Sequence, residues 1–213
     1  MSKTCNSYSK GQHIFREGDR VFGLFFIKEG RVKIVSSGFN NREQIARLAT
    51  NGHIIGHRGY GNELYPVSAI ALDETYVCFV DNSTIYDAFM NNAKFTYELM
   101  LFYSTELRKA ELRLRYLAQM TMREKIAGAL LYLLDIFGED EQDGSLNVSL
   151  SRQELADLAG TTAEQVSREL TSFEKESIIA KHSRKLILLN HEELNKILSS
   201  HNMRIAASSW AAI

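Results

Sequence analysis

The chain has 213 residues, a formal net charge of −1, 45% hydrophobic residues and one proline. This composition excludes a disordered or fibrous chain and allows one large or two modest globular domains. No apolar run approaches the roughly 20 residues of a membrane helix, and the first residues form no signal peptide, so we expect a cytoplasmic protein. The near-zero charge gives nucleic-acid binding little support by itself, although a whole-chain sum hides local basic patches.

Residues 11–81 have the pattern of β-structure. Short apolar runs separated by Gly, Asn or Asp are typical of strands joined by turns, and here they are HIF, GLFFIKEG, RVKIV, QIARL and TYVCFV. Many short strands with glycine turns indicate a sandwich, roll or barrel. We assign residues 1–91 to this β-domain.

The two cysteines, Cys5 and Cys78, predict no metal site. They are too few for the four thiolates of an ordinary iron–sulfur cluster, and they lack the spacing of a CxxC motif. A disulfide between them is one interpretation. In a cytosolic protein we instead expect two unrelated residues, with Cys78 buried in a strand and Cys5 on a loose terminus.

Helix formers dominate from about Asn82 to Met120, and residues 92–120 are predicted to form a long helix that ends in a hinge. Apolar residues recur there at alternating intervals of three and four, which is a heptad seam flanked by charges. The pattern favours a parallel dimer, and docking of the seam on the chain's own β-domain is the alternative. The seam consists of Met100, Tyr103, Leu107, Ala110, Leu114 and Leu117.

The third segment, residues 121–213, begins with the helix MREKIAGALLYLLDIFG, followed by an acidic loop, EDEQDG, and a predicted strand, LNVSL. Residues 151–176 then indicate two short helices joined by a tight turn at Gly160. Each helix offers the other a narrow apolar stripe, and capping boxes are predicted for Ser151 with Glu154 and for Thr161 with Glu164. This is the arrangement of a DNA-binding helix-turn-helix.

Residues 178–190, IIAKHSRKLILLN, predict two strands around a basic turn. A hairpin directly after a recognition helix is the wing of a winged helix. The segment HEELNKILSSHN is predicted to be a final helix, and the tail AASSWAAI indicates no function.

The order of β-domain, long helix and winged helix-turn-helix resembles the cyclic-AMP-receptor/FNR (CRP/FNR) family of bacterial transcription regulators. The resemblance covers roughly residues 10–200 and depends mainly on GQHIFREGDRVFGLFFIKEGRVKI and SRQELADLAGTTAEQVSREL. It implies an α+β fold with an N-terminal β-roll of the cyclic-nucleotide-binding, jelly-roll type. It also implies a homodimer that binds double-stranded DNA and contacts RNA polymerase.

The resemblance further implies that Glu164 and Arg168 read bases, with Ser167 beside them as in the FNR-like branch and a TGA-type core in each half-site. A carboxylate can accept from cytosine N4, and a guanidinium can bond guanine O6 and N7. A plain surface ion pair between the two residues is the alternative. Residues that could contact phosphates, or serve only as helix caps and solubilising charges, are Ser151, Arg152, Thr162, Lys181, Arg184 and Lys185.

The sensor segment GHRGYGNELYPVSAIAL departs from the family's cyclic-nucleotide binders. Gly56 and Ser68 fit, but His57 replaces the glutamate that holds the ribose, and Val67 replaces the arginine that neutralises the phosphate. Arg58 could approach the phosphate only from another direction. A buried phosphate without its cation is costly, so we expect an effector other than cyclic AMP at these five positions.

Some relatives bind haem, which would make His53 or His57 an axial ligand. We instead expect polar strand-end or surface histidines. No GxSxG, HExxH or Walker motif is present, so the sequence does not predict an enzyme. The second functional hypothesis is a ligand-binding or protein-interaction module whose helix-turn-helix does not read DNA.

Overall fold

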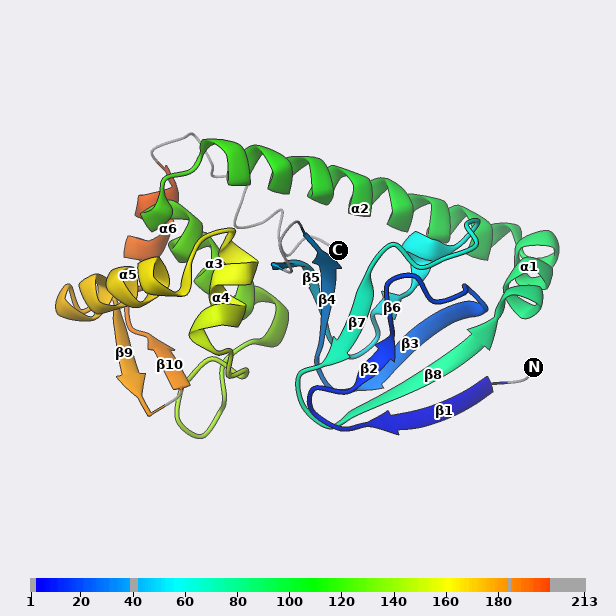
Figure 1. The fold of residues 1–213 in the computed structure, drawn as a ribbon, viewed down its shortest axis with the longest axis horizontal. Coiled ribbons are helices and arrows are strands. Elements are labelled where there is room, and N and C mark those ends of the chain that lie inside the picture. The colour runs from blue at the N-terminus through cyan, green and yellow to red at the C-terminus, as the bar shows by residue number, and fades with distance from the viewer. Residues whose placement is uncertain (1–2, 39–41, 184, 200–213) are drawn as a thin grey trace. The chain divides into compact units, whose positions relative to one another are not determined.

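A computed structural model describes residues 3–38, 42–183 and 185–199, which divide into two compact units, 1–103 and 104–213 (Figure 1). The boundary falls inside a long helix, α2 (Ala93–Gln119). None of the helices in these ranges combines the length and apolarity needed to cross a bilayer. The predicted α+β fold, with a β-domain, a long helix and a helical C-terminal part, is confirmed.

The first unit contains two four-stranded antiparallel sheets, as a β-roll requires. One has the order β1-β8-β3-β6 and the other β2-β7-β4-β5. All five predicted strand segments are strands; β6 and β7 lie inside the predicted β-region without having been named, and most of β1 lies outside it. The bounds are β1 Lys3–Tyr8, β2 His13–Phe15, β3 Gly23–Glu29, β4 Val32–Ser37, β5 Glu43–Ala49, β6 Ile54–Ile55, β7 Ser68–Ala71 and β8 Thr75–Asp81.

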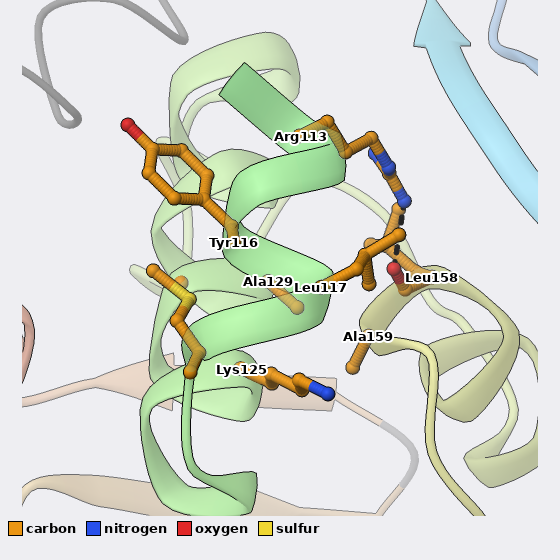
Figure 2. A pocket seen from close by; sticks show the side chains of 9 residues that line it. Arg113, Tyr116, Leu117, Lys125, Ala129, Leu158 and Ala159 are labelled. Carbon is orange, nitrogen blue, oxygen red and sulfur yellow. Dashed lines mark hydrogen bonds between the residues drawn. The ribbon is translucent and has the colours of Figure 1, made fainter. Parts of the chain in front are cut away.

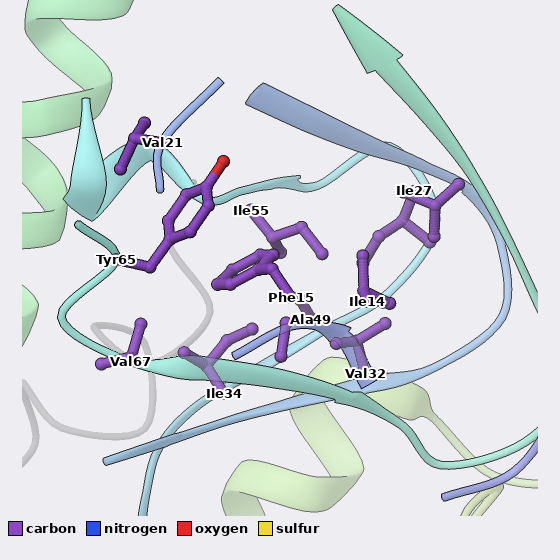
Figure 3. Close-up of a cluster of buried hydrophobic side chains, with 12 residues drawn as sticks. Ile14, Phe15, Val21, Ile27, Val32, Ile34, Ala49, Ile55, Tyr65 and Val67 are labelled. Atoms are coloured by element: carbon purple, nitrogen blue, oxygen red, sulfur yellow. The ribbon is translucent and has the colours of Figure 1, made fainter. Parts of the chain in front are cut away.

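Apolar side chains from the strands and their connections pack inside the roll (Figure 3). The Phe15 ring stacks on Tyr65 with centroids 4.3 Å apart, and the Tyr65 hydroxyl donates to the Gly23 carbonyl at 2.8 Å. The phenol is therefore satisfied although Tyr65 is buried, as a core tyrosine must be. The cluster comprises Ile14, Phe15, Val21, Ile27, Val32, Ile34, Ala49, Ile55, Tyr65, Val67, Ala69 and Val77.

The prediction of two unrelated cysteines was wrong. Residues 3–8 are not a loose terminus but the edge strand β1, which pairs with β8 in a register that places Cys5 opposite Cys78. The two form a disulfide with their Cα atoms 4.0 Å apart. The pairing is non-local, with a sequence separation of 73, so it gave no signal in the local pattern.

Two helices follow the β-roll in the chain. Helix α1 (Asn82–Asn91) has Asp81 as its N-cap, and the Asp81 carboxylate accepts from the Thr84 amide at 2.9 Å. Helix α2 begins at Ala93, so the predicted long helix from residue 92 is present. Its end at Gln119 and the extended backbone of Thr121 mark a break at the predicted hinge.

The second unit is helical, with one two-stranded hairpin. Helix α3 (Met122–Phe137) begins with a capping box of Thr121 and Glu124 and ends before Gly138, as predicted. The predicted strand LNVSL was wrong: within that segment only Leu146 forms an isolated bridge, with Glu139, and its amide donates to the Leu186 carbonyl. The remaining elements are α4 Arg152–Ala159, α5 Ala163–Lys175, β9 Ile179–His182, β10 Lys185–Leu188 and α6 His191–Ser199.

Replacement of Cys5 by serine should lower the free energy of unfolding of the first unit by about 2–4 kcal/mol under oxidising conditions, because the disulfide restricts the unfolded chain. Chemical denaturation with and without dithiothreitol measures this. Reductant should bring the wild type to the stability of the variant and leave the variant unchanged. Equal wild-type midpoints in the two conditions would contradict the disulfide.

Candidate nucleic-acid interface

Helix α4 is bounded as its sequence predicts. The Ser151 side chain accepts from the Glu154 amide at 3.1 Å, and the Glu154 carboxylate accepts from the Ser151 amide at 2.9 Å. The helix ends at Gly160, whose φ of 67° and ψ of 48° lie in the left-handed region that glycine adopts without steric cost. These two ends set the direction in which the chain enters α5.

Helix α5 begins one residue later than predicted. Thr162 is its N-cap, and the Thr162 hydroxyl accepts from the Gln165 amide at 3.3 Å. The predicted capping box of Thr161 with Glu164 is therefore wrong. Thr161 instead hydrogen-bonds with the Gln165 side chain and contacts the Met122 sulfur. Because Glu164 has no capping role, its carboxylate is available in the first turn of the helix.

The two faces of α5 differ sharply. Its apolar face is wholly buried, with Val166, Leu170 and Phe173 at 0% exposure. The opposite face carries the predicted base-reading residues Glu164, Ser167 and Arg168, all exposed. The Ser167 hydroxyl donates to the Ala163 carbonyl at 2.8 Å. The structure thus brings these three side chains together on one surface of one helix.

The proposed ion pair between Glu164 and Arg168 does not form. Within the described residues, the ion pairs of α5 instead join Glu169 to Arg123 and Glu174 to Lys181. Helical spacing adds exposed Thr171 and Lys175 to the stripe that contains Arg168, since residues three and four apart share a face. Sequence reasoning missed these two residues, although the spacing from Arg168 signals them.

Arg123, on α3, fixes the C-terminal half of α5. Its guanidinium donates to both carboxylate oxygens of Glu176, at 3.0 and 2.5 Å, and lies 4.7 Å from the centre of the Phe173 ring. The Arg123 charge and the Ser172 hydroxyl hold the Glu176 pKa below its ordinary value. A bidentate pair combined with stacking restrains both ends of the contact, so α5 has a defined orientation on α3.

Lys181 and Lys185 of the hairpin form ion pairs with carboxylates of the same chain. Lys181 donates to Glu174 at 2.7 Å, and Lys185 donates to Asp143 at 2.7 Å and to Asp140 at 3.3 Å. These contacts raise the pKa of Lys185 and lower that of Asp143. A phosphate at this turn would compete with the carboxylates. Arg184 lies outside the described residues.

The other predicted phosphate contacts lie at helix N-termini. Ser151 and Thr162 are the N-caps of α4 and α5, and both are exposed. Arg152 is the first residue of α4 and is half-buried. A helix N-terminus presents unpaired N–H groups and the positive end of the helix dipole, which suits an anion.

The predicted sensor residues separate into different environments. Gly56 has a φ of 82° and precedes a short 3-10 helix over His57–Gly59. Val67 belongs to the buried apolar cluster of the roll. Ser68 accepts from the Glu17 amide at 2.9 Å. The position at which the resemblance predicted a phosphate-neutralising arginine therefore holds a core side chain.

The expectation of surface or strand-end histidines was wrong for His57, which is only 3% exposed. Its ring meets Phe102 edge-on at 4.9 Å, and its carbonyl accepts from the Tyr103 hydroxyl at 2.9 Å. Burial, reinforced by the positive charges of Arg47 and Arg58, lowers the pKa of His57 to about 3. The imidazole is neutral at pH 7. Among the described residues, no three His, Cys, Asp or Glu side chains gather as a metal site.

Two family profiles match the chain. The profile of the cyclic nucleotide-binding domain matches residues 5–92, and that of the Crp-like helix-turn-helix domain matches residues 124–197. The first covers the roll with α1, and the second covers α3 through the hairpin into α6.

Characterised relatives align over most of their length. The transcriptional activator protein Anr of Pseudomonas protegens is 28% identical over 186 residues, which are 87% of this chain and 76% of that protein. The anaerobic regulatory protein of Bacillus subtilis is 26% identical over 203 residues, which are 93% of this chain and 85% of that protein.

Solved structures share the fold. FixK2 from Bradyrhizobium japonicum has a TM-score of 0.82 at 24% identity, with 92% of this chain and 98% of that chain covered. The c-di-GMP-responsive global regulator CLP of Xanthomonas campestris has a TM-score of 0.73 at 19% identity, with 87% and 93% covered.

The pKa of His57 makes the first unit less stable in acid. Between pH 6.5 and about 3 the unfolded chain binds a proton that the folded imidazole does not, so the free energy of unfolding falls as pH falls. From pH 6.5 to 5 the loss should be about 2 kcal/mol, and replacing His57 by Gln should remove it. Denaturation curves at both pH values measure the difference between the proteins. An identical pH dependence in the two would contradict the buried, neutral histidine.

Proposed function

Because the chain belongs to the CRP/FNR family of bacterial transcription regulators, we propose that it binds a DNA palindrome as a homodimer. Each protomer places one recognition helix, α5, in the major groove of a half-site with a TGA-type core. Glu164, Ser167 and Arg168 read the bases. The observation that carries this proposal is their common exposure on α5, opposite a wholly buried apolar face.

The chemistry of the exposed face suits a G·C base pair. A guanidinium fork bonds guanine O6 and N7, and a carboxylate accepts from cytosine N4. Glu164 and Arg168 are one helical turn apart, so both reach the same groove. Their lack of a mutual ion pair within the described residues leaves both groups available for bases.

Phosphate contacts would then come from the two helix N-termini and from the wing. Ser151, Arg152 and Thr162 lie at the N-terminal ends of α4 and α5, where the first N–H groups have no acceptor within the helix. Lys181 and Lys185 are weaker candidates, because each already has a carboxylate partner. Arg184 remains a candidate from the sequence alone.

The seam of α2 is the proposed dimer interface. Leu107 and Leu114 are 63% and 69% exposed, and Met100 is 58% exposed. Apolar residues at a heptad spacing that remain this exposed favour a second copy over docking within the chain. Half-buried Tyr103 and Leu117 also contact other parts of their own protomer.

The effector is proposed to be something other than cyclic AMP. A nucleotide phosphate needs a cation, and the family's arginine position holds buried Val67. His57 is neutral and packs on α2 residues, so it does not replace that charge. Since relatives are named transcriptional activators, contact with RNA polymerase is part of the proposal.

Replacing Arg168 by alanine should cost about 1–3 kcal/mol of specific binding, with little effect on folding. The binding site is first selected from a random DNA pool, and affinities are then measured at fixed salt. Arg168→Lys is the matched control, because it keeps the charge but loses the bidentate fork, so it should remain weak if bases are read.

Wild-type affinity of Arg168→Ala for a TGA-containing palindrome would contradict base reading by this residue. Binding by the wild type that is independent of DNA sequence would instead favour the alternative, a ligand-binding or protein-interaction module.

Replacing both Leu107 and Leu114 by glutamate should convert the dimer to monomers, since two like charges would face their counterparts across the seam. Sedimentation velocity measures the mass. Leu189→Glu is the control, because Leu189 is 56% exposed outside the seam and should leave the dimer intact. A double variant that sediments like the wild type would exclude this face as the interface.

A further inference from the structure

The second half of α2 has one exposed apolar face and one buried face. Leu107 and Leu114 are exposed, whereas Tyr116 and Met120 are 8% and 7% exposed and line a small apolar pocket. The opposite wall of that pocket is the C-terminal end of α4, with Leu158 and Ala159 (Figure 2). The helix proposed to hold the partner protomer therefore also packs on the first helix of the helix-turn-helix.

A hydrogen bond joins two residues that line this pocket. The Arg113 guanidinium donates to the Leu158 carbonyl at 2.7 Å, as the dashed line in Figure 2 shows. Carbonyls in the last turn of a helix have no intrahelical donor, and the negative end of the helix dipole favours a cation there. Arg113 directly precedes the seam residue Leu114 in the sequence, and the heptad pattern alone does not predict this contact.

The hydrogen bond between Arg113 and Leu158 joins residues on either side of the break between α2 and α3. The covalent path from Arg113 to Leu158 covers 45 residues and passes the break between Gln119 and Met122. At Thr121 the backbone is extended, with φ −65° and ψ 165°, so the series of helical hydrogen bonds is interrupted between Met120, whose amide donates to Tyr116, and Thr121, whose carbonyl accepts from Lys125. Bending there would change the distance between Arg113 and α4.

We propose that Arg113 and the apolar pocket around Leu117 and Leu158 form a latch, which locks the helix-turn-helix to the end of α2. Arg113 is a positioning residue and touches no base. Because α2 also carries the seam, the latch sets the separation of the two α5 helices and hence the half-site spacing that the dimer accepts. This inference rests on the proposed function.

Two measurements test the latch. In the first, Arg113→Ala, Arg113→Lys and the wild type bind TGA palindromes whose half-site spacing differs from the selected one by one or two base pairs. The wild type should prefer its own spacing by roughly tenfold or more, and Arg113→Ala should reduce the preference to about threefold or less. Arg113→Lys should restore most of it, because an ammonium can also donate to the carbonyl.

Arg115→Ala is the matched control, since Arg115 is an exposed arginine on the same helix. It removes the same charge and should keep the wild-type spacing preference. An unchanged preference in Arg113→Ala, or an equal loss in Arg115→Ala, would overturn the proposal.

The second measurement needs no DNA. Hydrogen exchange of the amides in residues 118–124 and 156–162 should be several-fold faster in Arg113→Ala than in the wild type or in Arg115→Ala. Equal exchange in all three would overturn the latch even if DNA binding is confirmed. Faster exchange in a protein that binds no palindrome would keep the latch and reject the proposed function.

Discussion

The burial of one face of α5 is the constraint on which the candidate interface depends. Val166, Leu170 and Phe173 have no exposed surface, and each fully buried side chain of this size contributes about 1.5–3 kcal/mol. Rotating the helix would expose these residues, so the opposite stripe is fixed outward. The Arg123 contacts with Glu176 and Phe173 add a directional restraint at the far end of the helix. The polar face is therefore presented by packing, without a ligand.

Local spacing was sufficient to predict most of this unit. The stripes of α4 and α5, the left-handed Gly160 and the Ser151 capping box follow from interactions within four residues, which a sequence displays directly. One error concerned the start of α5. Thr161 and Thr162 are both acceptable caps by residue type, but Thr162 caps the helix, and Thr161 contacts Met122, which is distant in the sequence.

Non-local contacts explain what the sequence did not predict. Strand β1 and its disulfide depend on a partner strand about seventy residues away, and burial of His57 depends on Phe102 and Tyr103 of α2. The segment LNVSL alternates like a strand, but only its first residue, Leu146, has a bridge partner. Alternation indicates a strand only where a neighbour supplies the hydrogen bonds.

The two carboxylates beside Lys185 limit what this lysine can contribute to the electrostatic attraction between the hairpin and DNA. A lysine that is already neutralised by Asp140 and Asp143 displaces few condensed cations when a phosphate approaches. Lys185 would thus act through shape and steric fit more than through long-range attraction. Ionic strength would then modulate the affinity of this protein less through Lys185 than through its helix N-termini.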